Sequence, residues 1–288
     1  MIEIEILKYF QSIRTESLDK VFEFITMIGE ETIMIILIAV LYFAFNKNFA
    51  QRLLFVSVAS LSVNGILKNI VKMPRPFAKG EITCVRPDTA TGYSFPSGHT
   101  QTFATSSTVI AQQFKKIWLT IITAFFILLV ALSRMYLGAH YPSDVIVGAI
   151  LGVVIALVGC NIYDKTKNKT KLYFITTLIL TPFAIYFLIQ ADPLFEDFFK
   201  IYGMIIGFLL GVMCEEKYAP LEYNVAWWKK VIRVIIAVII AYVIKEGIKM
   251  FDVFGITQIS LALDAIRYLV LIFVVFGLYP VFIKKVKI

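Results

Sequence analysis

Residues 117–137, IWLTIITAFFILLVALSRMYL, form an apolar run in which Arg134 is the one charged residue. Residues 143–162, SDVIVGAILGVVIALVGCNI, form a second run, whose one charged residue is Asp144. A helix crosses the hydrocarbon core of a bilayer with about 20 mostly apolar residues, so each run is long enough to span it. Only GAHYP, residues 138–142, separates the two runs. The stretch therefore predicts a helical hairpin in a membrane, with ionisable side chains gathered at its turn.

The composition of the whole chain agrees with a membrane protein. Its 288 residues are 59% hydrophobic and 17% charged, whereas a soluble domain carries about 25% charged residues. This excludes a disordered chain, a collagen and an ordinary cytosolic enzyme. The net charge of +8 would suggest nucleic acid as a partner of a soluble protein. Here it marks basic loops, so we expect a lipid bilayer and no nucleic acid as a partner, and the oligomeric state stays open.

Nine apolar runs predict an all-α fold, a polytopic membrane helix bundle with about nine transmembrane helices. Before them, residues 4–28 mix apolar and charged positions, which predicts an amphipathic helix in the membrane interface, with a frayed tail as the alternative. We therefore divide the chain into an interfacial segment at 1–29, a five-span core at 30–163 and a four-span region of unknown role at 172–288. The runs are 30–46, 52–73, 99–114, 117–137, 143–162, 172–190, 199–214, 231–249 and 265–283.

The placement of Lys and Arg predicts the orientation of these spans. If the spans alternate, one side of the membrane receives 15 of the 28 basic residues and only four of the 20 acidic ones. That side is cytoplasmic by the positive-inside rule, which places the N-terminus outside and the C-terminus in the cytoplasm. The loop 74–98 and the turn 138–142 then face the extracytoplasmic side of what we expect to be the plasma (inner) membrane.

Three polar clusters lie at the extracytoplasmic ends of the spans. They are KNIVKMPRP at 68–76, PSGH at 96–99 and SRMYLGAHYPSD at 133–144. They contain both histidines of the chain, His99 and His140. Two histidines and three scattered cysteines give neither a metal-ligand spacing nor a disulfide framework, so we predict no metal and no other cofactor.

The third cluster pairs a possible nucleophile with an orienting carboxylate. His140 and Asp144 are four residues apart, so on a helix they would share one face, where the carboxylate could fix the imidazole tautomer. Arg134 ends the preceding span and offers a planar fork to phosphate oxygens. A structural histidine is the alternative for His140 taken alone.

The first two clusters add cations and backbone donors. Lys68 and Arg75 are two helical turns apart and would share a face if their helix continued to Met73, although snorkelling anchors have the same spacing. Ser97 and Gly98 precede an apolar helix, whose first N–H groups can bind an anion, although an ordinary helix entry has this pattern too. Ionisable groups near a membrane are functional by default, and together the clusters predict a phosphate-handling site.

The clusters carry a family resemblance. The patterns K-x6-RP, PSGH and SR-x5-H-x3-D occur in this order, with no departure at any position, over residues 68–144. They resemble the three-part signature of the type-2 phosphatidic acid phosphatase superfamily, and the apolar framework extends the likeness to about 30–162. Residues 172–288 lie outside it. The matching positions are Lys68, Arg75, Pro76, Pro96, Ser97, Gly98, His99, Ser133, Arg134, His140 and Asp144.

The resemblance implies cleavage of a phosphate ester or diphosphate through a phosphohistidine. By motif position, His140 is the nucleophile, Asp144 orients it, and His99 is the general acid and then the base for water. The remaining positions bind the phosphoryl group. They are Lys68, Arg75 and Arg134, whose charges could replace a metal, with Ser97 and the Gly98 N–H as further donors.

The site at the membrane boundary predicts a membrane lipid substrate. The resemblance suggests undecaprenyl diphosphate as the first choice, with phosphatidic acid and phosphatidylglycerophosphate as further lipids. Two alternatives stay open. One is a sugar phosphatase resembling glucose-6-phosphatase, and the other is a lipid transporter that keeps a vestigial phosphate site.

Overall fold

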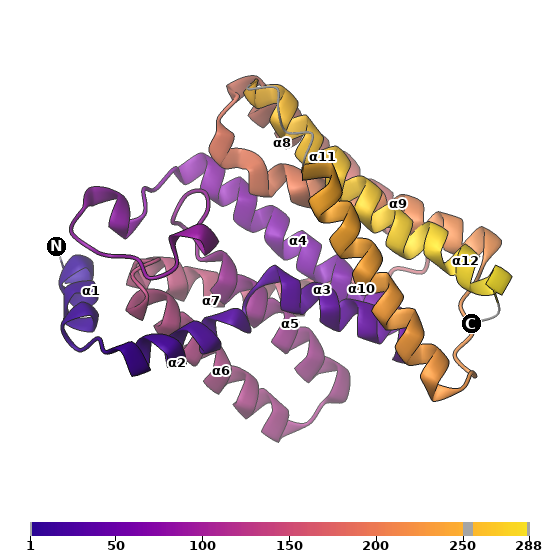
Figure 1. Ribbon diagram of the computed structural model, residues 1–288, viewed down its shortest axis with the longest axis horizontal. Coiled ribbons are helices and arrows are strands. Elements are labelled where there is room, and N and C mark those ends of the chain that lie inside the picture. The colour runs from indigo at the N-terminus through magenta and orange to yellow at the C-terminus, as the bar shows by residue number, and fades with distance from the viewer. Residues whose placement is uncertain (1, 250–255, 287–288) are drawn as a thin grey trace. The chain divides into compact units, whose positions relative to one another are not determined.

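The computed structural model describes residues 2–249 and 256–286, and within these ranges it contains helices and no strand (Figure 1). The all-α prediction is therefore confirmed. The α-helices are α1 (Ile2–Ser12), α2 (Glu16–Met27), α3 (Glu31–Val40), α4 (Lys47–Val71), α5 (Gly98–Phe114), α6 (Ile117–Tyr136), α7 (Pro142–Lys165), α8 (Lys169–Gln190), α9 (Glu196–Tyr218), α10 (Trp227–Lys249), α11 (Thr257–Phe273) and α12 (Tyr279–Val286). The short helices are η1 (Leu41–Phe45), η2 (Pro76–Lys79), η3 (Pro87–Thr89), η4 (Pro193–Phe195) and η5 (Val274–Leu278).

The protein is an integral membrane protein, as its apolar composition predicted. In the described part of the chain, six helical segments are long and apolar enough to cross a membrane, or seven if the bent pair Glu16–Met27 and Thr32–Phe45 forms one span. The count of nine is thus not confirmed, although all nine predicted runs are helical. One reason is visible in α5, whose 17 residues extend only about 26 Å, less than the hydrocarbon thickness of about 30 Å. The six segments are Lys47–Ala78, Ile117–Tyr136, Pro142–Lys165, Lys169–Gln190, Pro193–Tyr218 and Thr257–Val286.

The N-terminal segment is helical as predicted, but it forms two helices instead of one. Thr15 separates α1 from α2 and caps α2, because its hydroxyl accepts a hydrogen bond from the Leu18 N–H at 3.3 Å. Both helices lie against α6 (Figure 1). The ring of Phe22 stacks on that of Tyr136 with 4.1 Å between centroids, which fixes α2 on the C-terminal half of α6.

The chain forms two compact units, each of which combines two stretches of sequence. The first unit comprises residues 1–34 and 59–161, and the second comprises 35–58 and 162–288. All three polar clusters lie in the first unit. The division into 1–29, 30–163 and 172–288 concerns functional regions and stays a prediction.

In the first unit, two glycines let α7 approach the start of α5 closely. A Cβ atom at Gly148 would lie 2.7 Å from the Ser97 carbonyl oxygen, and one at Gly152 would lie 2.6 Å from that of Gln101. Small residues four apart allow this kind of backbone contact between membrane helices. The contact brings the beginning of α7 beside the beginning of α5, and both carry residues of the predicted site.

In the second unit, α9 packs on α11 and η5 through a stripe of glycines, Gly203, Gly207 and Gly211. A Cβ atom at Gly207 would collide with the Leu269 carbonyl oxygen. The end of α9 is held by a buried ion pair between Glu215 and Lys47. Glu215 also accepts a hydrogen bond from the Leu221 N–H at 2.9 Å, so one carboxylate fixes the chain that follows the helix.

Gly207→Val should destabilise the second unit, because the added side chain cannot be placed without moving α11. We expect a loss of about 1–3 kcal/mol, the usual cost of overpacking, seen as a lower midpoint of thermal unfolding in detergent. The matched control is Leu210→Val, since Leu210 is on the same helix but 40% exposed. Equal unfolding midpoints for the two variants would contradict the close packing of α9 on α11.

Candidate active site

The first unit brings the three polar clusters to the ends of four helices. Lys68 lies in the last turn of α4, and Arg75 follows that helix directly before η2. Ser97 precedes α5, whose first two residues are Gly98 and His99. The third cluster occupies the end of α6, the turn after it and the first turn of α7, where Arg134, His140 and Asp144 lie respectively.

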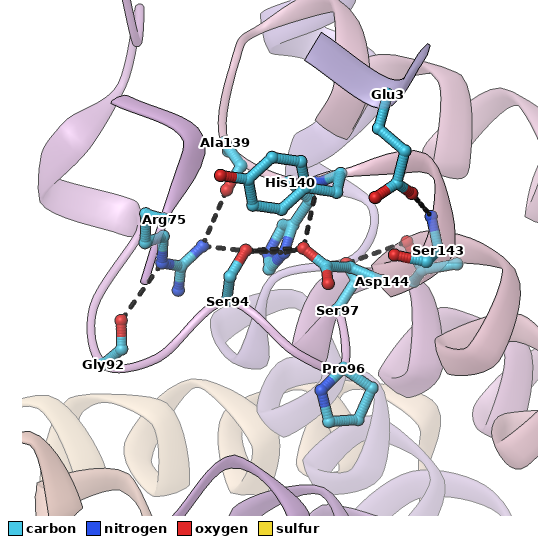
Figure 2. A network of polar contacts seen from close by, with 12 residues as sticks. Glu3, Arg75, Gly92, Ser94, Pro96, Ser97, Ala139, His140, Ser143 and Asp144 are labelled. Carbon is cyan, nitrogen blue, oxygen red and sulfur yellow. Dashed lines mark hydrogen bonds and ion pairs between the residues drawn. The ribbon is translucent and has the colours of Figure 1, made fainter. Parts of the chain in front are cut away.

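A hydrogen bond joins His140 to Asp144, as the spacing predicted, but not by stacking along a helix. His140 precedes α7, which begins at Pro142. The Asp144 side chain reaches back from the third helical position, and its Oδ2 atom lies 3.2 Å from His140 Nδ1 and accepts the Tyr141 N–H at 2.9 Å (Figure 2). This is the carboxylate half of a capping box, with proline at the first helical position. Both side chains are at most 1% exposed.

Arg75 defines the tautomer of His140. Its Nη1 atom lies 2.9 Å from His140 Nε2 and 3.1 Å from the Ala139 carbonyl oxygen, and its Nε donates to the Gly92 carbonyl oxygen at 3.1 Å (Figure 2). A guanidinium can only donate, so Nε2 must be the acceptor and carries the lone pair. The proton of the neutral ring is then on Nδ1, where it faces Asp144. The imidazole therefore presents a nucleophilic Nε2 toward Arg75.

The surroundings of His140 keep its ring neutral. Burial lowers the pKa of the imidazole well below its ordinary value of 6.5, and the positive charges of Arg75 and then Arg134 lower it further. A neutral imidazole retains the lone pair that a nucleophile needs.

Arg134 is a buried cation whose hydrogen-bond donors are only partly used. Its side chain is 1% exposed, and its Nη1 donates to Thr26 Oγ1 at 2.9 Å. Its Nε and Nη2 are buried and have no hydrogen-bond partner among the described residues. The backbone carbonyl of Arg134 accepts the N–H of Ala139 at 3.0 Å and that of His140 at 3.3 Å, so the arginine and the histidine belong to one tight turn. Unsatisfied buried guanidinium donors are suited to an anion.

The residues that begin α5 occupy the other side of the site. Ser97 binds α7 through its backbone, because its N–H donates a hydrogen bond to the Asp144 carbonyl oxygen at 3.0 Å. Its Oγ atom lies 3.0 Å from Thr100 Oγ1. His99 is half-buried, and its Nε2 has no partner within the described ranges. That nitrogen is therefore available to a bound group.

The prediction that Lys68 and Arg75 share one helix face is wrong, because Arg75 does not lie on α4. Helix α4 ends at Val71, and Lys72 has a left-handed backbone (φ 50°) and closes the helix by donating its N–H to the Lys68 carbonyl oxygen at 2.9 Å. Arg75 then has an extended backbone. Both cations are nevertheless buried, at 6% exposure each. The segment that follows the end of α4 places the side chain of Arg75 beside His140.

Three residues with polar contacts in the site, Ser94, Glu3 and Thr26, were not predicted from the sequence. The Ser94 hydroxyl donates to Asp144 Oδ2 and lies 3.5 Å from His140 Nδ1 (Figure 2). Glu3, on α1, accepts the Ser143 N–H at 2.8 Å and so satisfies the start of α7. Thr26, on α2, binds Arg134. No sequence pattern marks them, because each depends on segments folded against one another over a long separation.

No obvious metal site accompanies these residues. Among the residues that the structure describes, no three His, Cys, Asp or Glu side chains group closely enough to hold a metal ion. The positive charge of the site comes from Lys68, Arg75 and Arg134.

Comparison with known proteins identifies the family. Residues 49–168 match the PAP2 superfamily, and residues 199–288 match the transmembrane extension of PAP2 superfamily phosphatases. Undecaprenyl-diphosphatase of Sulfolobus acidocaldarius is 28% identical over 58% of this chain and 81% of that protein. Undecaprenyl-diphosphatase BcrC of Bacillus subtilis is 30% identical over 52% of this chain and 77% of that protein.

A further relative has a different substrate in its name. Glucose-6-phosphatase catalytic subunit 1 of Haplochromis nubilus is 29% identical over 54% of this chain, which spans about half, 53%, of that relative's length. The family matches, the two diphosphatases and the three-part signature agree with one another. The resemblance found in the sequence is confirmed, and the chain belongs to the PAP2 superfamily.

Proposed function

We propose that this membrane phosphatase hydrolyses the mono- or diphosphate headgroup of a lipid through a phosphohistidine at His140, with undecaprenyl diphosphate as the first-choice substrate. The observation that carries the proposal is the buried line Arg75–His140–Asp144. It fixes the ring orientation and exposes the lone pair of Nε2 beside a cation, which are the two conditions for in-line attack on a phosphoryl group.

In the first step, Nε2 of His140 forms a bond to phosphorus while the bond from phosphorus to the leaving oxygen breaks. The phosphoryl group displaces Arg75 from Nε2, and Arg75, Arg134 and Lys68 stabilise the charge on its oxygens. His99 gives its proton to the leaving oxygen. The Nδ1 proton stays on His140, where Asp144 stabilises the now cationic ring.

In the second step, water attacks the phosphohistidine. His99, now neutral, takes a proton from the water as the new oxygen–phosphorus bond forms, and the phosphorus–nitrogen bond breaks. Phosphate leaves and Nε2 recovers its lone pair. Ser97 and the Gly98 N–H are further donors to the phosphoryl oxygens.

The choice of a lipid is supported by the apolar helices that carry the site and by the diphosphatase relatives, most of whose length this chain covers. A soluble sugar phosphate is the second candidate, supported by the glucose-6-phosphatase relative. A lipid transporter with a vestigial phosphate site is the alternative outside the enzyme class.

Purified protein should release phosphate from undecaprenyl diphosphate more efficiently than from phosphatidic acid, phosphatidylglycerophosphate or glucose 6-phosphate. Because three cations supply the charge that a metal would supply, release should be unaffected by EDTA. Phosphate release from each substrate is measured in detergent with and without EDTA. Release from glucose 6-phosphate alone would favour the sugar phosphatase, and loss of release in EDTA would contradict metal independence.

His140→Ala should lower kcat by at least about 10³-fold, and Asp144→Asn by about 10²–10⁴-fold, because the first removes the nucleophile and the second the acceptor that fixes its tautomer. Asp164→Asn is the matched control, since Asp164 lies on the same helix, is 55% exposed and pairs with Arg52. A substantial residual kcat of His140→Ala would refute the nucleophile, and lipid movement that survives this substitution would favour the transporter.

The pH dependence of kcat/KM should be bell-shaped, because His140 must be neutral and His99 must be protonated at the start of the reaction. The acid limb, which belongs to His140, should lie below pH 6.5. The pKa of His140 is lowered, so the neutral, reactive ring predominates down to a pH below the ordinary value and is lost only as the pH falls through the lowered pKa. The profile is recorded on a monoester and on a diphosphate, so that a limb shared by both belongs to the enzyme. A shared acid limb above pH 6.5 would contradict the assignment.

We also propose that the site faces the extracytoplasmic side, as the Lys and Arg distribution predicts. In a variant whose three cysteines are replaced by serine, Asp88→Cys should react with a membrane-impermeant thiol reagent in intact cells. Lys167→Cys should react only after permeabilisation. Both positions are exposed, so accessibility does not bias the comparison. The opposite labelling pattern would show that the site faces the cytoplasm.

A further inference from the structure

The N-terminal helices reach the site from outside the matched family region. Helices α1 and α2 precede residue 49, where the PAP2 match begins. Besides the stacking of Phe22 on Tyr136, the Tyr136 hydroxyl donates to Asp19 Oδ1 at 2.9 Å. Helix α2 is therefore fixed by an aromatic and a polar contact to the last turn of α6, the turn that also carries Arg134.

Thr26 is the point at which α2 meets the site. Its side chain is fully buried in the last turn of α2, and its Oγ1 accepts Nη1 of Arg134 at 2.9 Å. The long side chain of arginine loses considerable rotamer freedom when it is fixed. Because the guanidinium is planar and rigid, a buried acceptor at one of its nitrogens determines where its other donors point. Those other donors, Nε and Nη2, have no partner in the described part of the chain.

The same turn of chain also contacts the second cluster. A Cβ atom at Gly29 would lie 2.9 Å from the His99 carbonyl oxygen, so the chain leaving α2 lies directly on the backbone of His99. Next to it, Glu30 pairs with Arg86 at 2.8 Å. At the other end of the segment, Glu3 accepts the Ser143 N–H. Residues 3–30 thus contact the starts of α5 and α7 as well as the end of α6.

The charge of Arg134 acts within the site. After burial and Arg75, it is the next largest cause that lowers the pKa of His140. Its guanidinium therefore lies within electrostatic reach of the nucleophile. The orientation of this fork matters for the phosphoryl group that His140 would attack.

We propose that Thr26 is a positioning residue of the active site, whose hydroxyl holds Nη1 of Arg134 so that Nε and Nη2 serve the phosphoryl oxygens. The inference rests on the proposed function, because it assigns to Arg134 a phosphoryl group as its ligand. It makes the N-terminal segment part of the catalytic unit and not merely an interfacial anchor.

The test compares three variants of the full chain. Thr26→Val keeps the shape and removes the acceptor, Thr26→Ser keeps the hydroxyl, and Thr123→Val is the matched control, because Thr123 is another buried threonine and lies on α6 itself. The readouts are kcat, KM, the inhibition constant of orthovanadate as a mimic of the phosphoryl group, and the midpoint of thermal unfolding.

Thr26→Val should lower kcat by about tenfold or more and weaken vanadate inhibition by a similar factor, which corresponds to one hydrogen bond to a charged group. KM should change much less. Thr26→Ser should recover most of the activity, and Thr123→Val should match the wild type. If Thr26→Val does not fold, Thr26→Ala removes the same acceptor without adding volume.

Other outcomes distinguish the role of Thr26 from the proposed function of the protein. Activity that depends on His140 but is equal in Thr26→Val and Thr123→Val would overturn the role of Thr26 alone. A lower unfolding midpoint with unchanged kcat and vanadate inhibition would show a purely structural contact and overturn it too. Absence of His140-dependent phosphate release in the wild type would instead refute the proposed function.

Discussion

The hydrogen bond between Asp144 and His140 is the constraint on which the rest of the site depends. Because Oδ2 accepts a hydrogen bond from the Nδ1–H, the lone pair of the neutral ring is on Nε2, and only a donor can lie there, which in the resting protein is Arg75. The carboxylate is itself held by two further donors, the Tyr141 N–H and the Ser94 hydroxyl. A buried acceptor shared in this way has little freedom to move, so the imidazole that it holds is pre-organised.

Close helix packing makes this arrangement possible. Gly148 lets the backbone of α7 approach the Ser97 carbonyl oxygen, and the Ser97 N–H donates a hydrogen bond to the Asp144 carbonyl oxygen. The starts of α5 and α7 are therefore held together by contacts between backbone atoms. Asn64 on α4 adds to these contacts, since its amide donates to Gln101 Oε1 at 2.8 Å and to the Pro96 carbonyl at 3.3 Å. In a membrane such polar contacts are favourable because the alternative is an unsatisfied group in a low dielectric.

The sequence alone predicted those features that are set by local chemistry. Apolar run length indicated the helices of the nine runs, and the spacing from His140 to Asp144 indicated their contact. Predictions that required the path of the chain were weaker. The helix that carries Lys68 stops at Val71, because Lys72 takes a left-handed turn, and Arg75 therefore reaches His140 from a loop. Ser94 and Thr26 could not be found, since hydroxyls far from the motifs acquire their meaning only from tertiary contacts. The count of nine spans is not confirmed, because short runs such as α5 are helical without being long enough to cross a membrane in the described part of the chain.

The tautomer of His140 also bears on whether the site binds or reacts. A site built only to bind phosphate is best lined with donors, and a lone pair directed at an anion is repulsive. Arg75 and Arg134 meet the first requirement, but Nε2 presents its lone pair to the same place that their charges make attractive to phosphate. The buried carboxylate of Asp144 adds negative charge nearby, which again weakens binding of an anion. Both features are costly for a receptor or a transporter. They are useful when the lone pair is to form a bond to phosphorus and the carboxylate is to stabilise the cationic ring that results.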